Sequence, residues 1–297
     1  MDRRSFMQNS VLAGLAVSAS PLFSSTSLGS KPLDKKSLKF GMIKEEIPLV
    51  DKFKLIKELG FDGVELDSPN ELDEQEILKA RDQADIIIPG VVNSIHWKSP
   101  LSDPDPAVRK ICTDSMIDAL HKCKMYGGTT VLLVPAVVNK DVSYADAWTR
   151  SVAEIKKILP EAHKTGIKIA IENVWNNFLL SPMEAAQYID QFDSDHIGWY
   201  MDVGNIVRYG WPEQWIRTLG SRILKVDIKE YSRKKQQEEG IWKGFQVEIG
   251  DGDCDWASVN KALTEIGYSG WGSAEVQGGD RTRLEEISQR MDQIYSL

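Results

Sequence analysis

Five short β-type runs in this sequence end on a carboxylate, and a sixth ends on an imidazole. The carboxylates are those of Glu65, Glu172, Asp202, Asp227 and Glu275, and the imidazole is that of His96. One charged residue after an apolar run is often a helix cap or a surface residue. Five such residues on five separate runs indicate a shared acidic site.

Carboxylates that are brought together repel one another, so they need protons or a cation. A pair about 4 Å apart repels by about 4 kcal/mol at an effective dielectric constant near 20. The four that we expect to meet at one site, Glu172, Asp202, Asp227 and Glu275, supply only oxygen. Oxygen ligands suit a hard ion better than they suit zinc, so we expect one divalent cation, Mn²⁺ or Mg²⁺, at these residues. In the alternative, Lys225 and Lys229 offset part of the charge without a metal.

Such a site suits proton transfer next to a carbonyl group. That reaction needs a base at the carbon and a cation at the developing enediolate oxygens. We predict that Glu172 and Glu275 are the catalytic pair, which takes a proton and returns it on the other face or at the adjacent carbon. Lys229 would either polarise a substrate oxygen or pair with Glu230 or Asp251.

Three tryptophans are candidates for contact with a sugar. Trp97 and Trp175 follow predicted strand ends, and Trp242 lies in a long polar segment over 230–255 that we predict to be a functional lid. An indole face in such a loop can stack on a sugar ring, and local packing is the alternative.

The runs that carry these residues alternate with amphipathic segments. Eight strands are expected, at 38–43, 63–66, 90–96, 130–134, 167–172, 197–202, 223–228 and 270–275. Helices are expected between them, among others at 49–59, 106–126, 144–164, 182–192 and 256–266. This alternation predicts an α/β fold, a single (β/α)8 TIM barrel, in which the strand ends form the active face. An open doubly wound sheet is the competitor, but the sequence has no G-x-G-x-x-G turn.

Composition narrows the class of protein. The chain has 297 residues, of which 42% are apolar, and 36 basic against 44 acidic residues give a net charge of −8. This balance argues against a nucleic-acid partner. Cys112, Cys123 and Cys254 are too few for a disulfide scaffold.

The first 30 residues differ from the rest and predict an export signal. A start with Arg3 and Arg4, a short apolar run over 11–19 and a Ser-rich stretch resemble a twin-arginine signal peptide. We therefore expect a signal at 1–30, a linker at 31–37, the barrel domain at 38–297, and export to the periplasm. Such a short run cannot span a bilayer, so no stable membrane insertion is expected. The alternative is a weakly basic N-terminus on a cytoplasmic protein.

The chain resembles the xylose-isomerase-like TIM barrels, a superfamily of sugar and sugar-phosphate isomerases and epimerases. The matching segments are 60–66 (GFDGVEL), 171–173 (IEN), 199–205 (WYMDVGN), 222–230 (RILKVDIKE) and 249–256 (IGDGDCDW). Members similar to ketose 3-epimerases bind one divalent ion through Glu, Asp, His and Glu. The resemblance assigns these ligands to Glu172, Asp202, position 227 and Glu275, where position 227 is Asp and not His.

The resemblance also implies roles for individual residues and a class of reaction. Glu172 and Glu275 would be the acid and the base, and Glu65 and His96 would contact the substrate. The implied activity is a metal-dependent ketose or keto-sugar isomerase or epimerase with a small-molecule sugar substrate, and a homo-oligomer is compatible with it. No basic cluster accompanies Gln277, so we expect a sugar without phosphate.

Two other functions stay open from the sequence. The same bases and metal could drive β-elimination, as in a lyase or dehydratase that acts on a keto-sugar, keto-glycoside or inosose. A non-catalytic exported barrel that only binds a sugar is the alternative of another class. Zinc endonucleases of the superfamily need many histidines, and the chain has 4.

Overall fold

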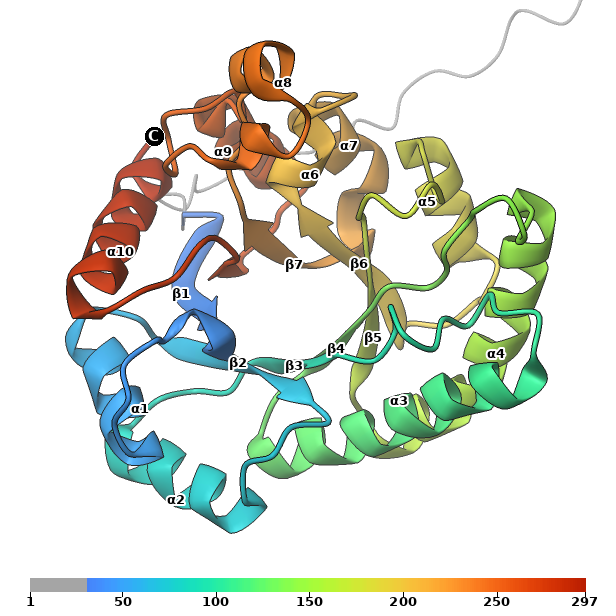
Figure 1. Ribbon diagram of the computed structural model, residues 1–297, viewed down its shortest axis with the longest axis horizontal. Coiled ribbons are helices and arrows are strands. Elements are labelled where there is room, and N and C mark those ends of the chain that lie inside the picture. Colours follow the sequence, from blue (N-terminus) through green and yellow to red (C-terminus); the bar gives the residue numbers. More distant parts are fainter. Residues whose placement is uncertain (1–30) are drawn as a thin grey trace, which may run out of the picture. The chain divides into compact units, whose positions relative to one another are not determined.

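The computed structural model describes residues 31–297, which form a closed parallel barrel (Figure 1). Its strands follow one another around the ring in chain order, and the last strand pairs with the first. Helices connect the strands on the outside of the barrel. The predicted (β/α)8 architecture is confirmed. The predicted export signal lies outside the described residues.

Seven strands lie close to their predicted positions, whereas the first covers residues 33–39 and not the predicted 38–43. The strands are β1 (Leu33–Lys39), β2 (Gly63–Ser68), β3 (Gly90–Asn93), β4 (Thr130–Leu133), β5 (Lys168–Glu172), β6 (Ile197–Asp202), β7 (Ile223–Ile228) and β8 (Gly270–Ala274). Three boundaries differ in a way that matters. β1 begins at Leu33, where it pairs with Gly270 of β8, so most of the predicted linker belongs to the barrel. β2 continues past Glu65 to Ser68, and β3 ends before His96.

All five helices predicted by range are present. They are α1 (Leu49–Glu58), α3 (Pro106–Tyr126), α4 (Tyr144–Thr165), α5 (Pro182–Asp190) and α9 (Trp256–Glu265). The other helical segments are α2 (Glu74–Ala84), α6 (Val203–Val207), α7 (Pro212–Leu219), α8 (Arg233–Glu239), α10 (Arg281–Tyr295) and the 3-10 turns η1 (Phe40–Met42), η2 (Gly220–Arg222) and η3 (Lys243–Phe245). Polar side chains begin several of them, as when Asp105 accepts from the N–H of Ala107 and Ser143 accepts from the N–H of Asp146.

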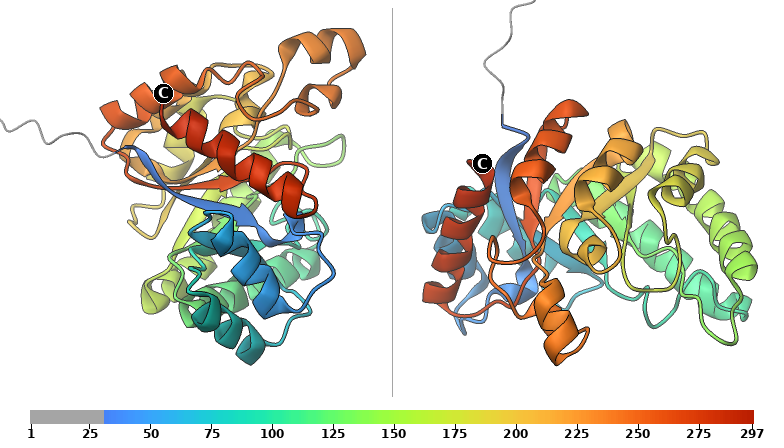
Figure 2. Two further views of the ribbon diagram at one scale, coloured as in Figure 1. Left: turned by 90° about the vertical axis from the view of Figure 1, so that its left-hand side faces the viewer. Right: turned by 90° about the horizontal axis from the view of Figure 1, so that it is seen from above.

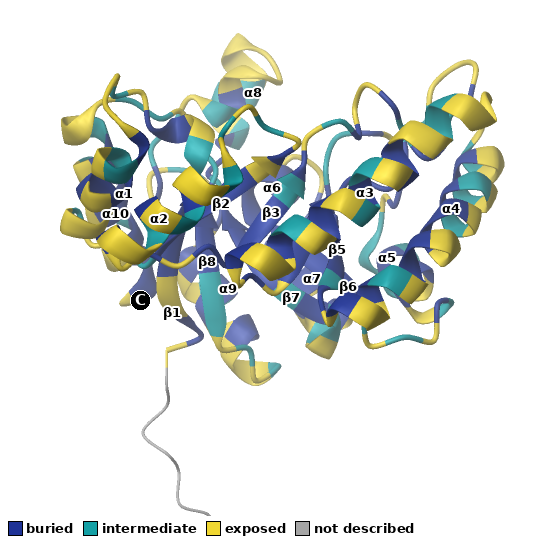
Figure 3. Cartoon of the chain, turned by 90° about the horizontal axis from the view of Figure 1, so that it is seen from below, coloured by how far each residue is buried: buried dark blue, intermediate teal, exposed yellow. Residues whose placement is uncertain are grey.

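The apolar core lies between the strands and the surrounding helices, which bury one face and expose the other (Figure 3). Within residues 31–297, no helix is long and apolar enough to cross a membrane. The three cysteines, Cys112, Cys123 and Cys254, are buried and free. Burial raises the pKa of the Cys112 and Cys123 thiols to about 12.

The predicted lid is partly helical. Residues 230–255 contain α8 and η3, and Figure 2 shows α8 standing out beyond the end of the barrel at which the strands finish. This is the end on which the active face of a parallel barrel is expected.

Candidate metal and active site

Four carboxylates meet at the C-terminal end of the barrel, as the sequence predicts. Glu172 and Asp202 are the last residues of β5 and β6, Asp227 is in β7, and Glu275 directly follows β8. Each offers an oxygen that lies within 4.8 Å of the others. The register explains part of this closeness, because Asp202 is the direct β-partner of Asp227.

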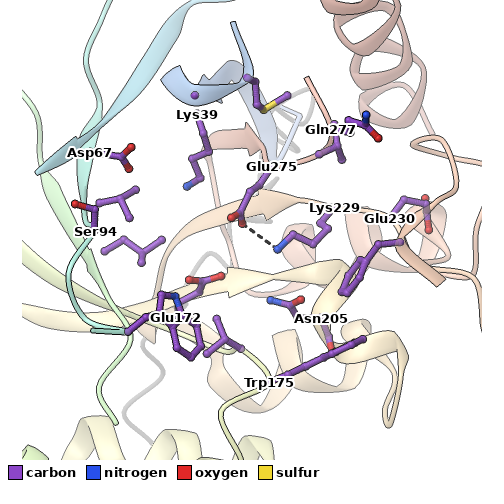
Figure 4. A pocket seen from close by; sticks show the side chains of 18 of the residues that line it. Lys39, Asp67, Ser94, Glu172, Trp175, Asn205, Lys229, Glu230, Glu275 and Gln277 are labelled. Carbon is purple, nitrogen blue, oxygen red and sulfur yellow. Dashed lines mark hydrogen bonds and ion pairs between the residues drawn. The ribbon is translucent and has the colours of Figure 1, made fainter. Parts of the chain in front are cut away.

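Two lysines lie among these carboxylates. Lys229 Nζ is 2.7 Å from Asp202 Oδ2 and 3.0 Å from Glu275 Oε2 (Figure 4). Lys39 Nζ is 2.9 Å from Asp227 Oδ1. Of the two alternatives for Lys229, pairing with Glu230 or Asp251 was therefore wrong, because Lys229 directly follows β7 and faces the same side as Asp227. Asp251 instead pairs with Arg290, at 3.0 Å.

The lysines do not satisfy the whole cluster. Both oxygens of Asp227 are buried; Oδ1 has the ion pair with Lys39, and Oδ2 has no partner within the described part of the chain. Burial raises the pKa of Glu172 well above its ordinary value, and the neighbouring Glu275 and Asp227 raise it further. Burial likewise raises the pKa of Asp227, against the influence of Lys39. A carboxylate cluster that is this short of positive charge fits a hard divalent cation.

The pKa of Glu275 is shifted in the opposite direction. Burial alone would raise it, but Lys229 and Lys39 hold the pKa of Glu275 below its ordinary value of 4.5. Glu172 and Glu275 therefore differ in their affinity for a proton. Two carboxyl groups with different proton affinities can act as an acid and a base at one site.

Glu65 is not at the mouth of the barrel, although we predicted that it contacts substrate. Its carboxylate lies inside the barrel and receives Lys225 Nζ at 2.8 Å, Lys39 Nζ at 2.7 Å and the Tyr200 hydroxyl at 2.8 Å. The physical reason is the length of β2, which continues for three residues beyond Glu65. Asp67, near the end of the same strand, lines the cavity in its place.

Asn173 and Asn205, which sequence reasoning missed, fix the position of Asp202. Asn205 donates to Asp202 through its backbone N–H at 2.8 Å and its side-chain amide at 2.7 Å. The side-chain oxygen of Asn173 accepts from the N–H of Asp202 at 3.0 Å. The sequence contained a signal for both residues. Asn173 directly follows Glu172, and Asn205 lies three residues after Asp202, in the first turn of the helix that Asp202 caps. Lys39 gave no such signal, because the predicted strand continued to residue 43 and placed Lys39 near its start, whereas β1 ends at Lys39.

His96 lies in the turn after β3 and faces the cavity. Its Nδ1 accepts from the N–H of Val134 at 3.3 Å, which leaves Nε2 to carry the proton. Burial lowers the pKa of His96 from 6.5 to about 4. The imidazole is therefore neutral at physiological pH and can donate one hydrogen bond to a ligand.

A cavity of about 840 Å³ opens above the carboxylates. Lys39, Glu172, Lys229 and Glu275 line it, and His96, Trp97, Trp175 and Trp242 form other parts of its wall. Figure 4 shows Glu172, Lys229 and Glu275 facing one another across this space. Apart from Glu65, every residue that we predicted to contact substrate therefore lines one cavity.

The three tryptophans differ in how they are held. Trp175 packs against Trp242 and Phe245, with ring centroids 4.9 and 4.8 Å away, and the Arg208 guanidinium lies 4.7 Å from its ring. Its indole N–H donates to the Asn205 carbonyl at 2.9 Å. Trp175 thus forms part of the wall by local packing. The side chains of Trp97 and Trp242 are 51% and 67% exposed.

Two curated relatives show what the chain is similar to. An uncharacterized protein of Methanocaldococcus jannaschii is 25% identical over 208 residues, which cover 64% of this chain and 67% of that protein. The inosose dehydratase of Lacticaseibacillus casei is 22% identical over 142 residues, 44% of this chain. The match spans 48% of that dehydratase, about half its length.

Solved structures share the fold over most of the chain. The D-psicose 3-epimerase of Clostridium cellulolyticum H10 superposes with a TM-score of 0.72 at 17% identity, covering 89% of this chain and 99% of that one. The 3-keto-D-glucoside 4-epimerase of E. coli superposes with a TM-score of 0.75 at 15% identity, with the same coverage of 89% and 99%.

The sequence also matches one family model over most of its described length. Residues 53–296 match the model for the xylose isomerase-like TIM barrel, and this range contains all four clustered carboxylates. The chain belongs to the xylose isomerase-like TIM barrel family.

Proposed function

We propose that this protein is a divalent-metal-dependent sugar isomerase or epimerase that acts on a ketose or keto-sugar. The observation that supports it most is the meeting of Glu172, Asp202, Asp227 and Glu275 below a cavity, with the Asp227 carboxylate short of partners. These four would hold one Mn²⁺ or Mg²⁺. When bound, the ion would supply Lewis-acid stabilisation of charge on substrate oxygens.

Glu172 and Glu275 are the proposed proton-transfer pair. They come from β5 and β8, which lie three strands apart in the ring, so they approach a ligand in the cavity from different directions. One carboxylate would remove a proton from the carbon next to the carbonyl, and the other would deliver a proton to the opposite face or to the adjacent carbon. The opposite directions of their pKa shifts fit this division of labour.

Lys229 and His96 are proposed to orient the sugar. The Lys229 ammonium lies between Asp202 and Glu275 and can donate to a substrate oxygen that sits between them. His96 can donate through Nε2, since its Nδ1 is occupied by Val134. Because these two donors follow different strands, they would fix which carbon of the sugar faces the carboxylates.

A lyase or dehydratase is the second candidate. The similarity to an inosose dehydratase supports it, and the same bases could remove a proton and expel water from a keto-sugar. A barrel that binds sugar without turnover is the candidate of another class.

Metal binding is tested first, by titrating Mn²⁺ into protein stripped with EDTA. We expect one site, which Asp227→Asn weakens at least about tenfold because one charged ligand is lost. Glu265→Gln, which changes an exposed carboxylate on α9, is the matched control. His163, Asp195 and His196 form a second grouping near the start of β6, and their imidazoles favour softer ions. Mn²⁺ is therefore the probe, because it prefers the carboxylate site. No saturable Mn²⁺ binding would overturn the metal-dependent proposal.

The reaction is tested by NMR in D2O with Mn²⁺ and a panel of ketoses and keto-glycosides. Epimerase or isomerase action exchanges one carbon-bound proton for deuterium and retains all oxygens of the sugar. An unsaturated product with loss of water would identify the lyase instead. Binding without exchange in wild-type protein would identify the non-catalytic barrel.

We also propose export through the twin-arginine route, on the basis of Arg3 and Arg4 before a short apolar run. The test fuses residues 1–37 to a reporter and compares it with the double variant Arg3→Lys and Arg4→Lys. Periplasmic reporter that disappears in the variant supports export. Cytoplasmic reporter in both fusion proteins would contradict it.

A further inference from the structure

The cavity has more room than the reacting part of a sugar needs. Its volume of about 840 Å³ lies near the upper end of the range of pockets that bind drug-sized molecules. The reactive groups Glu172, Lys229 and Glu275 occupy one part of its lining. The rest of the lining combines aliphatic and polar side chains with the aromatic rings of Trp97, Trp175, Trp242 and Phe245.

Two exposed indoles line this cavity from different segments. Trp97 follows β3, whereas Trp242 lies in the segment after β7, where its ring packs on Trp175 with centroids 4.9 Å apart. Both side chains line the cavity, yet they are 51% and 67% exposed. Exposed aromatic surface at a cavity costs free energy in water, and it is covered when a ligand with apolar C–H faces stacks on it.

The lining carries no ammonium that is free for a phosphate among the residues described. Lys39 is paired with Glu65 at 2.7 Å and with Asp227 at 2.9 Å, while Lys229 is paired with Asp202 and Glu275. The turn before α10 is also occupied, because the Gly279 N–H donates to the Met42 carbonyl at 3.0 Å. The cavity therefore suits an uncharged ligand.

We propose that the substrate is an unphosphorylated glycoside with two rings. The reacting keto-sugar ring lies over Glu172 and Glu275, and the second ring lies at the mouth between Trp97 and Trp242. This assignment rests on the proposed function for the reacting ring only. The second-ring site depends on the indoles and on the space between them.

The test compares ligands with one ring and with two rings on the full chain. Calorimetry in Mn²⁺ measures the affinity for D-fructose and for three ketose disaccharides: lactulose, turanose and palatinose. We expect at least one disaccharide to bind about tenfold more tightly than fructose. Trp242→Ala and Trp97→Ala should each lower the preference for that disaccharide over fructose about two- to tenfold, the value of an aromatic contact.

Trp211→Ala is the matched control, because Trp211 is 55% exposed and is not part of the cavity lining. It should change neither affinity. Equal affinity for fructose and all disaccharides, a parallel loss for both ligand types in Trp242→Ala, or no binding of any probe would each overturn the second-ring site.

These outcomes are separable from those of the proposed function. Proton exchange on fructose without any preference for two rings would support the isomerase or epimerase and overturn the second-ring site. Trp242-dependent disaccharide binding without exchange, in any of the probes, would support the second-ring site and count against the proposed reaction.

Discussion

Glu65 shows how a single buried carboxylate can be mistaken for a ligand contact. It is 2% exposed and is surrounded by Lys39, Lys225, Tyr200 and Ser273, whose hydroxyl oxygen is 3.2 Å away. The two lysines hold the pKa of Glu65 far below its ordinary value, although burial opposes them. Because all its partners belong to the barrel, its contribution is to folding.

Removal of the charge on Glu65 should destabilise the fold strongly. Glu65→Gln leaves Lys225, which is 1% exposed, without its counter-ion, and loss of one member of a buried pair costs about 3–5 kcal/mol. Urea unfolding followed by circular dichroism measures the change. The double variant Glu65→Gln with Lys225→Met removes both charges and should recover part of the loss. A change below about 1 kcal/mol in the single variant would contradict this account.

His96 makes stability depend on pH in a defined window. Its pKa is about 4 in the folded protein against an ordinary 6.5, so between these values the unfolded chain binds the proton and the folded protein does not. Stability should therefore fall as the pH drops from about 6.5 to about 4, by up to about 3 kcal/mol. Chemical unfolding of the wild-type protein and of His96→Gln at several pH values isolates the contribution of His96 to the pH dependence. An identical pH dependence in both proteins would show that His96 is not the cause.

At the scale of elements, the segment between β7 and α9 is organised by one side chain. The buried Glu230 carboxylate accepts from the backbone N–H groups of Tyr231, Gly250 and Cys254 at 3.1, 2.8 and 3.2 Å, and from the indole N–H of Trp256 at 2.9 Å. Four donors on one carboxylate fold the chain back against the barrel. Glu230 directly follows Lys229, so the same bonds help to hold the end of β7.

Loss of Glu230 should loosen this segment before the barrel itself. Glu230→Ala leaves buried donors without an acceptor, at a cost of at least about 2 kcal/mol in local stability. Hydrogen exchange should rise at residues 249–256 and stay unchanged in β4, on the far side of the ring. Glu238→Ala, which changes an exposed carboxylate of α8, is the control. An equal rise in hydrogen exchange at residues 249–256 and in β4 would contradict a local role for Glu230.

The strands and long helices could be predicted because their patterns are local. Strand ends were harder, since the length of β2 depends on its pairing with β3 through Ser68 and Asn93. The early start of β1 depends in the same way on its pairing with β8. These partners are far apart in sequence, so periodicity alone could not fix the ends, and the errors in the ends of β2 and β3 follow from this.

At the scale of the whole molecule, the barrel brings together carboxylates from four strands that repel one another. Mn²⁺ at about 100 times its dissociation constant should stabilise the folded state by about 2.7 kcal/mol, and so raise the melting temperature by about 5–10 °C. A tenfold weaker Mn²⁺ affinity in Asp227→Asn should remove about half of this shift, and the variant should melt no lower without metal, because it removes one negative charge from a crowded site. Differential scanning calorimetry with Mn²⁺ and with EDTA checks both parts. An equal shift in the variant would count against Asp227 as a ligand.

The convergence of these carboxylates could be predicted from topology, because parallel strands in a closed ring finish at one end. The lysines between them could be predicted only in part. The alternation of β7 places Lys225 on the same side as Asp227. Lys39, however, contacts Asp227 as well as Glu65, and Lys39 and Asp227 lie far apart in the sequence. Such a contact depends on side-chain conformation in the finished barrel.

The burial of all three thiols makes the barrel insensitive to its redox surroundings. The thiolate is the form that reacts with oxidants, and pKa values of about 12 for Cys112 and Cys123 leave almost none of it at neutral pH. Cys254 is buried as well, with its thiol 3.3 Å from the Lys229 carbonyl. We therefore expect the three thiols of the folded protein to stay reduced in air, in an oxidising compartment as well as in a reducing one.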